Sequence, residues 1–176
     1  MRIIAGRLGG RHFNPPHGHV THPMSDRARG ALFNMLGDLA GLQILDAFAG
    51  SGALSFEAIS RGAEQVLAIE RDKSAIRSIS EAIRELGVQS SMKLIQAGTH
   101  SWLATNPDRQ FGIVLCDPPY DDLQPSLLVQ LAARVEKGGL LVLSWPAGQE
   151  PPTFNGLNQI ERRTYAGAQL IFYRAE

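Results

Sequence analysis

The sequence contains a single cysteine, Cys116, and no long apolar run. One cysteine cannot form a disulfide within the chain, and such usage is typical of a protein in a reducing compartment. No stretch reaches the roughly 18 apolar residues that a membrane-spanning helix needs, and the residues after Arg2 do not resemble a secretory signal. We therefore expect a cytoplasmic protein that does not enter a membrane.

The chain also lacks a net charge, because 17 Lys and Arg residues balance 17 Asp and Glu residues. A neutral total argues against a nucleic-acid partner, but the charges are unevenly distributed. Residues 1–36 carry five arginines and one aspartate, a net charge of +4, which leaves −4 on residues 37–176. A basic segment of this kind can bind phosphate groups, or it can be no more than a soluble tail. The candidate nucleic-acid contacts are Arg7, Arg11, Arg27 and Arg29.

Residues 1–36 are predicted to form a small extension. Two short β segments, Arg2–Ala5 and Arg11–Phe13, flank Gly9-Gly10 and favour a hairpin. A helix is expected over residues 25–36, with Ser25 as its N-cap. The apolar residues that share its buried face are Ala28, Ala31, Leu32 and Met35. This pattern places Arg27 and Arg29 off the buried face, free to touch a ligand.

Strand-like and helix-like segments alternate over residues 37–176, which form the second expected domain. The predicted strands are 43–47, 65–69, 92–95, 111–116 and 140–144, and the predicted helices are 53–61, 73–86 and 123–135. Alternation of this kind indicates an α/β fold with a parallel sheet and right-handed crossovers. Two further β segments, 159–165 and 169–173, close the chain and predict an antiparallel edge.

The segment Asp46–Gly52 lies where the first predicted strand passes into a helix. Its glycines allow a tight turn and close approach of a ligand, although a turn alone would also explain them. A dinucleotide loop usually has a third glycine or alanine, and this chain has Ser55 there. The acidic residue before the first glycine instead favours S-adenosylmethionine, with Asp46 near its amino group. Glu70 ends the next strand, where a carboxylate can bind the ribose hydroxyls.

Asp117-Pro118-Pro119-Tyr120 directly follows the strand predicted over 111–116. The aryl amine of a base is a poor nucleophile, and the Asp117 carboxylate and the Pro118 carbonyl can accept both of its N–H groups. Pro118 and Pro119 stiffen the carbonyl, and Tyr120 offers a flat face for stacking. A plain turn is the alternative interpretation. The order of the two motifs on successive strands favours transfer of a methyl group to an exocyclic amine, without a metal.

On these residues the sequence resembles the bacterial small-subunit ribosomal RNA guanine-N2 methyltransferases. The resemblance covers most of the chain, and the motifs near its start are the most discriminating. The matching blocks are Arg2–Gly6 with Gly9–Arg11, Ser25–Arg29 with Ala31–Asn34, Phe48–Leu54 with Glu57-Ala58 and Ser60–Ala63, and Asp117–Tyr120. The chain departs from the family at His22, where arginine is usual, at Gly30, where glutamate is usual, and at Gly98, where an acid or amide often contacts adenine.

The resemblance implies a Rossmann-like class I methyltransferase fold and S-adenosylmethionine as cofactor. The substrate it implies is one guanine of 16S ribosomal RNA, presented on naked RNA or a partly assembled small subunit. The implied cofactor contacts are Asp46, Phe48, Ala49, Gly50, Ser51, Gly52, Glu70, Arg71, Gly98 and Thr99, and the catalytic residues are Asp117, Pro118, Pro119 and Tyr120. The N-terminal extension is expected to grip RNA, and the protein is expected to be a monomer.

Other functions stay open at this point. An amino-methyltransferase can act on DNA adenine or a protein glutamine, and a relic cofactor pocket would leave a non-catalytic RNA-binding module. A nicotinamide oxidoreductase is disfavoured by Ser55. His12, His17, His19 and His22 could suggest a metal site, but the chain offers no nearby cysteines, and loop histidines often lie near phosphate.

Overall fold

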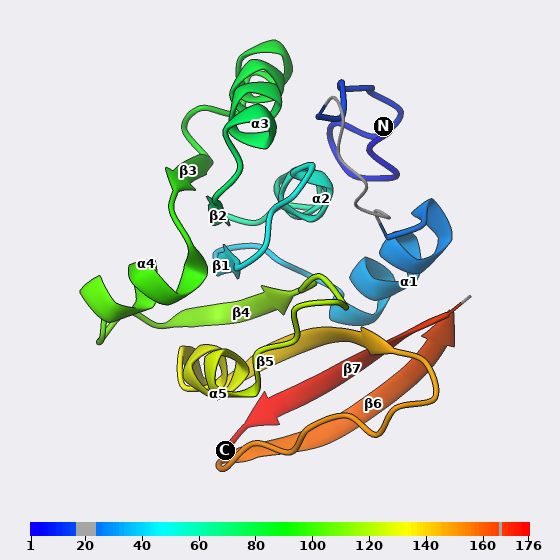
Figure 1. The fold of residues 1–176 in the computed structure, drawn as a ribbon. Helices are drawn as coiled ribbons and strands as arrows, with labels where there is room; N and C mark the ends of the chain where they lie inside the picture. The colour runs from blue at the N-terminus through cyan, green and yellow to red at the C-terminus, as the bar shows by residue number, and fades with distance from the viewer. Residues whose placement is uncertain (17–23, 166) are drawn as a thin grey trace.

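A seven-stranded sheet with the order β3-β2-β1-β4-β5-β7-β6 organises the chain (Figure 1). The structure is a computed structural model that describes residues 1–16, 24–165 and 167–176. The strands are β1 Gln43–Asp46, β2 Gln65–Glu70, β3 Met92–Gln96, β4 Phe111–Cys116, β5 Val135–Pro146, β6 Leu157–Tyr165 and β7 Ala168–Ala175. Strands β1 to β5 run parallel, and β7 pairs antiparallel with both β5 and β6. The expected α/β class and antiparallel closing pair are confirmed.

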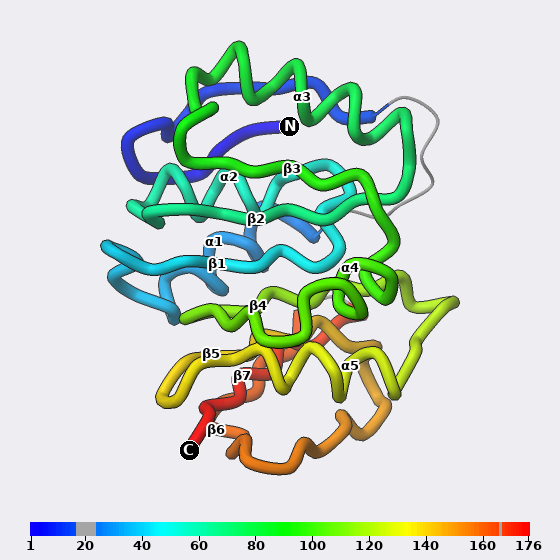
Figure 2. The backbone as a smooth tube through the Cα atoms, turned by 90° about the vertical axis from the view of Figure 1, so that its left-hand side faces the viewer, coloured from blue at the N-terminus to red at the C-terminus, as the bar shows by residue number. Residues whose placement is uncertain are grey.

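Helices cover both faces of the sheet, as a mostly parallel sheet requires. They are α1 Asp26–Leu36, α2 Ala53–Ser60, α3 Lys73–Leu86, α4 Thr99–Thr105 and α5 Pro125–Ala132. One hydrophobic cluster joins the first sheet face to α1, α2, α3 and the N-terminal arm, defined as residues 1–16. A second cluster joins the opposite face to α4 and α5 (Figures 1 and 2). None of the helices in the described ranges is long and apolar enough to cross a membrane.

The N-terminal arm folds back on itself and packs into the core. Arg2 and His12 form an antiparallel bridge, and Gly10 turns the chain with a φ of +83°. Ile3 and Phe13 are buried, and the Phe13 ring lies 4.8 Å from the ring of Phe56 on α2. The bridge confirms the antiparallel return that the glycine pair indicated.

A buried carboxylate on α2 fixes the arm in place. Glu57 is fully buried and accepts hydrogen bonds from the backbone N–H groups of Ile4, at 2.7 Å, and Ala5, at 3.1 Å. The same carboxylate accepts a 2.7 Å hydrogen bond from Arg61 Nε. No strand in the described part of the chain pairs with the N–H groups of Ile4 and Ala5, so the Glu57 carboxylate supplies the acceptors that a neighbouring strand would otherwise provide.

The prediction that Arg29 lies off the buried face of its helix, free to touch a ligand, is wrong. Its side chain is 1% exposed and lies between α1, the arm and Glu57, with Nε 4.0 Å from a Glu57 carboxylate oxygen. Its Nη2 donates to the Arg2 carbonyl and to the Asp26 carboxylate, and its Nη1 donates to the Met24 carbonyl. The buried face of α1 is turned toward Arg29 and Phe33, which leaves Met35 36% exposed. The helix turns this face inward because Arg29 finds a buried partner in Glu57 of α2, and a pattern of apolar residues does not reveal such a partner.

Two further differences concern the second half of the chain. The sequence pattern predicts a helix over 123–135, but α5 ends at Ala132 and Val135 already pairs with Phe111 on β4. Gly138 and Gly139 form a bulge within β5, because the ladder resumes only at Leu140 opposite Ile113. A Cβ on Gly139 would come within 2.6 Å of the Gly112 carbonyl oxygen, so the close approach requires glycine. Helix α4 has no counterpart among the predicted elements.

Candidate active site

The carboxyl ends of the parallel strands form one edge of the sheet, where ligands bind in folds of this kind. Asp46 ends β1 and pairs with Ala68 of β2 on one side and with Leu115 of β4 on the other. Glu70 ends β2, and Asp117 directly follows β4. The parallel register therefore brings the acidic residues of both sequence motifs to the same edge.

The loop after β1 has the backbone that the two glycines predict. Gly50 has a φ of +54° and Gly52 a φ of +79°, and a Cβ on Gly52 would come within 2.8 Å of the Phe56 ring. The Gly50 N–H donates a 2.7 Å hydrogen bond to Glu70 Oε2. Glu70 Oε1 accepts from the N–H groups of Arg71 and Asp72, both at 2.8 Å. Glu70 thus braces the loop, and its Oε2, which accepts one hydrogen bond, keeps an acceptor position for a ribose hydroxyl.

Asp46 is fully buried beneath this loop. Its Oδ2 accepts a 2.6 Å hydrogen bond from the Ser55 hydroxyl, while Oδ1 is buried with no hydrogen-bond partner among the described residues. Burial, with a smaller contribution from the nearby Asp117 and Glu70, raises the pKa of Asp46 to about 7, and the hydrogen bonds from Ser55 and the Phe48 backbone oppose this rise. An unpaired buried acceptor is costly, and a ligand ammonium group would satisfy it. The residues present therefore fit the amino group of S-adenosylmethionine.

The remaining predicted cofactor residues surround the same edge. Thr99 is buried, and its hydroxyl donates a 2.6 Å hydrogen bond to the Ala47 carbonyl, which ties the start of α4 to the end of β1. Gly98 precedes α4, and Arg71 is exposed after β2. Phe48, Ala49 and Ser51 lie in the loop itself, with Phe48 packed against the cluster under α4 and α5. Thr99 acts here as a brace, a role the sequence did not indicate.

The Asp117–Tyr120 segment lies beside the cofactor loop. Burial raises the pKa of Asp117, opposed by a hydrogen bond from Ser144, and Asp117 in turn raises the pKa of Asp46. Pro118 is buried and Pro119 is exposed. Tyr120 is 40% exposed, and its hydroxyl lies 2.7 Å from Ser144 Oγ. The two motifs are thus within electrostatic reach of one another, with an aromatic ring at the surface of the site.

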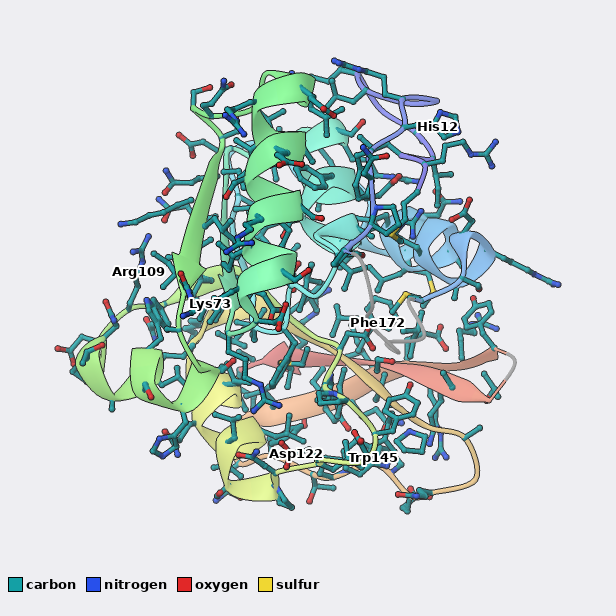
Figure 3. The ribbon with its side chains drawn as sticks, turned by 45° about the horizontal axis from the view of Figure 1, so that its top comes forward. His12, Lys73, Arg109, Asp122, Trp145 and Phe172 are labelled. Carbon is teal, nitrogen blue, oxygen red and sulfur yellow. The ribbon has the colours of Figure 1, made fainter. Side chains whose placement is uncertain are left out.

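Sequence reasoning missed two residues of this site. In the sequence, Ser55 is distinguished only as a departure from a dinucleotide loop, whereas in the structure it is the hydrogen-bond partner of Asp46. Ser144, on β5, contacts both Asp117 and Tyr120. A signal was available for Ser144, because a polar residue near the carboxyl end of an apolar strand is the same feature that identified Asp46 and Asp117. Figure 3 labels Trp145, which follows Ser144, and Asp122, which lies two residues after Tyr120.

The candidate nucleic-acid residues divide into two groups. Arg7 and Arg27 are exposed and available to a ligand. Arg11 is exposed but donates to the carbonyls of Glu85 and Leu86 at the end of α3, and Arg29 is buried as described above. No metal-binding group of three His, Cys, Asp or Glu side chains is found among the described residues. His17, His19 and His22 lie outside the described ranges.

The raised pKa of Asp46 predicts a pH-dependent cofactor affinity. A protonated carboxyl cannot balance an ammonium group, so the affinity for S-adenosylmethionine should rise about tenfold per pH unit below 7 and level off above it. Calorimetric titrations between pH 5.5 and 8.5 measure this slope. Asp46→Asn should weaken binding and flatten the profile, while Asp108→Asn, at an exposed aspartate, should leave both unchanged. A wild-type affinity that is constant across this range contradicts the prediction.

Known proteins resemble this chain over its whole length. A family model described as conserved hypothetical protein 95 matches residues 1–174. Ribosomal RNA small subunit methyltransferase D of Escherichia coli K12 is 35% identical over 142 residues, which are 80% of this chain and 69% of that one. A Bacillus subtilis protein provisionally named rRNA methyltransferase YlbH is 29% identical over 181 residues, 99% of this chain and 98% of its own length.

The fold agrees with these relatives. A solved Escherichia coli structure, provisionally named methyltransferase yhhF, matches with a TM-score of 0.87 at 26% identity and covers 100% of this chain and 98% of that chain. The sheet order and this match confirm the expected Rossmann-like class I methyltransferase fold. The resemblance drawn from the sequence motifs is likewise confirmed. The protein belongs to the conserved hypothetical protein 95 family, and the ribosomal RNA small subunit methyltransferase D proteins are among its relatives.

Proposed function

We propose that this protein transfers a methyl group from S-adenosylmethionine to the exocyclic N2 amine of one guanine in 16S ribosomal RNA. The observation that supports the proposal is that Asp117, which directly precedes Pro118, lies close enough to Asp46 to raise its pKa, at the sheet edge where Glu70 binds the Gly50 N–H. An acidic side chain next to a rigid carbonyl suits an amine with two N–H groups. The names of the relatives, which describe ribosomal RNA methyltransferases, support the same substrate class.

The cofactor is held by groups that the loop presents. Asp46 Oδ1 accepts from the ammonium group, the Gly50–Gly52 backbone allows close approach, and Glu70 accepts from the ribose. Phe48, Ala49, Ser51, Arg71, Gly98 and Thr99 complete the proposed cofactor site. Bound S-adenosylmethionine supplies a methyl group activated by a positively charged sulfur.

Asp117 and Pro118 orient the amine. They accept hydrogen bonds from its two N–H groups, so that the nitrogen would face the methyl group. The positive charge that develops on the nitrogen is stabilised by the same two acceptors. Pro119 keeps the backbone rigid, and the exposed ring of Tyr120 offers a stacking surface for the base. Asp117 is half-buried, and this partial shielding from water strengthens both interactions.

The N-terminal extension, residues 1–36, grips RNA in this proposal, and residues 37–176 carry the catalytic domain. Arg7 and Arg27 supply exposed positive charge. Arg11, which is hydrogen-bonded to the carbonyl of Glu85 at the end of α3, adds to this charge. Arg29 instead holds the extension to the body of the protein. The protein acts as a monomer in the cytoplasm, on naked RNA or on a partly assembled small subunit.

A strain that lacks the protein tests the proposal. Mass spectrometry of its 16S ribosomal RNA should show the loss of one N2-methylguanine, and the wild-type protein should restore it. A double variant, Arg7→Ala with Arg27→Ala, should restore it more slowly, with a salt dependence reduced by about two charges. Purified protein offered naked 16S RNA, small subunits and DNA identifies the substrate form. An unchanged content of N2-methylguanine, or methylation of DNA alone, refutes the proposed substrate.

A further inference from the structure

Ser144 occupies a position that the proposed mechanism has not yet used. It lies on β5 and is 3% exposed. Strand β5 pairs in parallel with β4, and Cys116, the last residue of β4, lies opposite Leu143. The next step of that register places Ser144 beside Asp117. Its Oγ lies 2.7 Å from the Tyr120 hydroxyl. One buried hydroxyl therefore stands between the carboxyl group and the phenol of the Asp117–Tyr120 segment.

The chemistry of the three groups fixes the direction of these hydrogen bonds. An ionised carboxylate can only accept, so Ser144 must donate its single proton to Asp117. With that proton engaged, Ser144 Oγ can only accept from Tyr120, whose hydroxyl must be the donor. The resulting chain runs from Tyr120 through Ser144 to Asp117. Its far end reaches solvent, because Tyr120 is 40% exposed.

We propose that Ser144 is a positioning residue that links Asp117 to Tyr120 and that, if the proposed function holds, this chain carries the amine proton out to solvent. After the N–C bond forms, an N–H bond of the cationic amine breaks and its proton goes to Asp117. Protonated Asp117 becomes a donor, so the two hydroxyls turn: Asp117 then donates to Ser144 Oγ, Ser144 to Tyr120 and Tyr120 to water, and one proton moves along each of these hydrogen bonds. The carboxylate is restored, and each hydroxyl keeps one proton.

Other titratable groups around Asp117 are poor exits for this proton. Asp46, on β1, is fully buried, and burial raises its pKa to about 7 while Ser55 of α2 covers one oxygen. The Cys116 thiol is also buried, and burial together with Asp46 and Asp117 raises its pKa. Tyr120 is the partly exposed member of the group. Among these neighbours, the path through Ser144 and Tyr120 is the one that reaches water.

Single-turnover methyl transfer on 16S RNA, measured from pH 6 to 9, tests the chain. Ser144→Ala and Tyr120→Phe should each slow the chemical step about tenfold to hundredfold, with cofactor affinity unchanged. Ser144→Thr, which keeps the hydroxyl, should retain most of the rate. The double variant should be no slower than the worse single variant, because both break the same chain. Ser90→Ala, at an exposed serine on the surface, is the matched control.

The pH profile adds a readout that a packing defect would not move. Since the hydrogen bond from Ser144 lowers the pKa of Asp117, Ser144→Ala should shift the acidic limb of the rate profile to higher pH. Equal losses for Ser144→Ala and Ser144→Thr, or losses that multiply in the double variant, overturn the proposal.

A second measurement separates failure of this link from failure of the proposed function. The Ser144–Tyr120 hydrogen bond couples the phenol to Ser144, so the NMR titration of Tyr120, assigned with Tyr120→Phe, should shift in Ser144→Ala whether or not RNA is a substrate. If the wild-type protein methylates no RNA but this titration moves, the proposed function fails and the hydrogen-bonded link stands, without its role as a proton path. If RNA is methylated and the titration stays fixed, the link itself is refuted.

Discussion

Asp117→Ala should lower the rate of methyl transfer about 10³-fold while S-adenosylmethionine still binds with nearly wild-type affinity. The carboxylate holds the amine and balances its growing positive charge in a buried setting, where loss of one such interaction typically costs two to three orders of magnitude. The groups proposed to contact the cofactor, Asp46 and Glu70, stay in place in this variant. Single-turnover assays on 16S RNA and calorimetry with the cofactor measure the two quantities separately.

Two further variants sharpen this test. Asp117→Asn keeps the shape and one acceptor oxygen but adds an N–H donor facing the amine, so an intermediate rate is expected. Asp121→Ala changes an exposed aspartate a few residues away and should behave as the wild type. Near-normal turnover by Asp117→Ala would show that Asp117 does not act on the amine. Loss of cofactor binding in that variant would instead assign Asp117 a role in the cofactor site.

Glu57→Ala should lower the free energy of unfolding by about 3–5 kcal/mol, the usual loss when one partner of a buried charge pair is removed. The change leaves the Arg29 guanidinium, 1% exposed, without the carboxylate that lies 4.0 Å away. It also removes the acceptor of the Ile4 and Ala5 N–H groups and of Arg61 Nε. Urea unfolding followed by circular dichroism measures the loss.

The control for this prediction is a helix glutamate in a solvated setting. Glu81→Ala, on the exposed surface of α3, should change the free energy of unfolding by less than about 0.5 kcal/mol. Proteolysis should cleave the arm of Glu57→Ala before the rest of the chain, because Glu57 holds the arm to α2. If Glu57→Ala and Glu81→Ala are equally stable, the buried network does not anchor the arm.

The local elements were largely predictable because each is encoded by adjacent residues. Asp72 caps α3 by accepting from the Ala75 N–H, and Gly87 ends the helix in the left-handed conformation. Ser25 caps α1 in the same way. The cofactor loop and the Asp117–Tyr120 segment were also recognised, since each is a short motif directly after an apolar strand. Strand alternation then places both motifs at one edge of a parallel sheet.

What the sequence by itself determined is the set of elements, their order and the chemistry of the two motifs, because caps, glycines and apolar spacing act over a few residues. The tertiary structure decided that Arg29 turns inward to Glu57, that Val135 joins β5 instead of α5, and that Ser144 lies between Asp117 and Tyr120. Each of these depends on a partner far away along the chain. Hydrogen bonds and buried charge pairs between distant segments leave no periodic signal, so only the folded chain shows which residues meet.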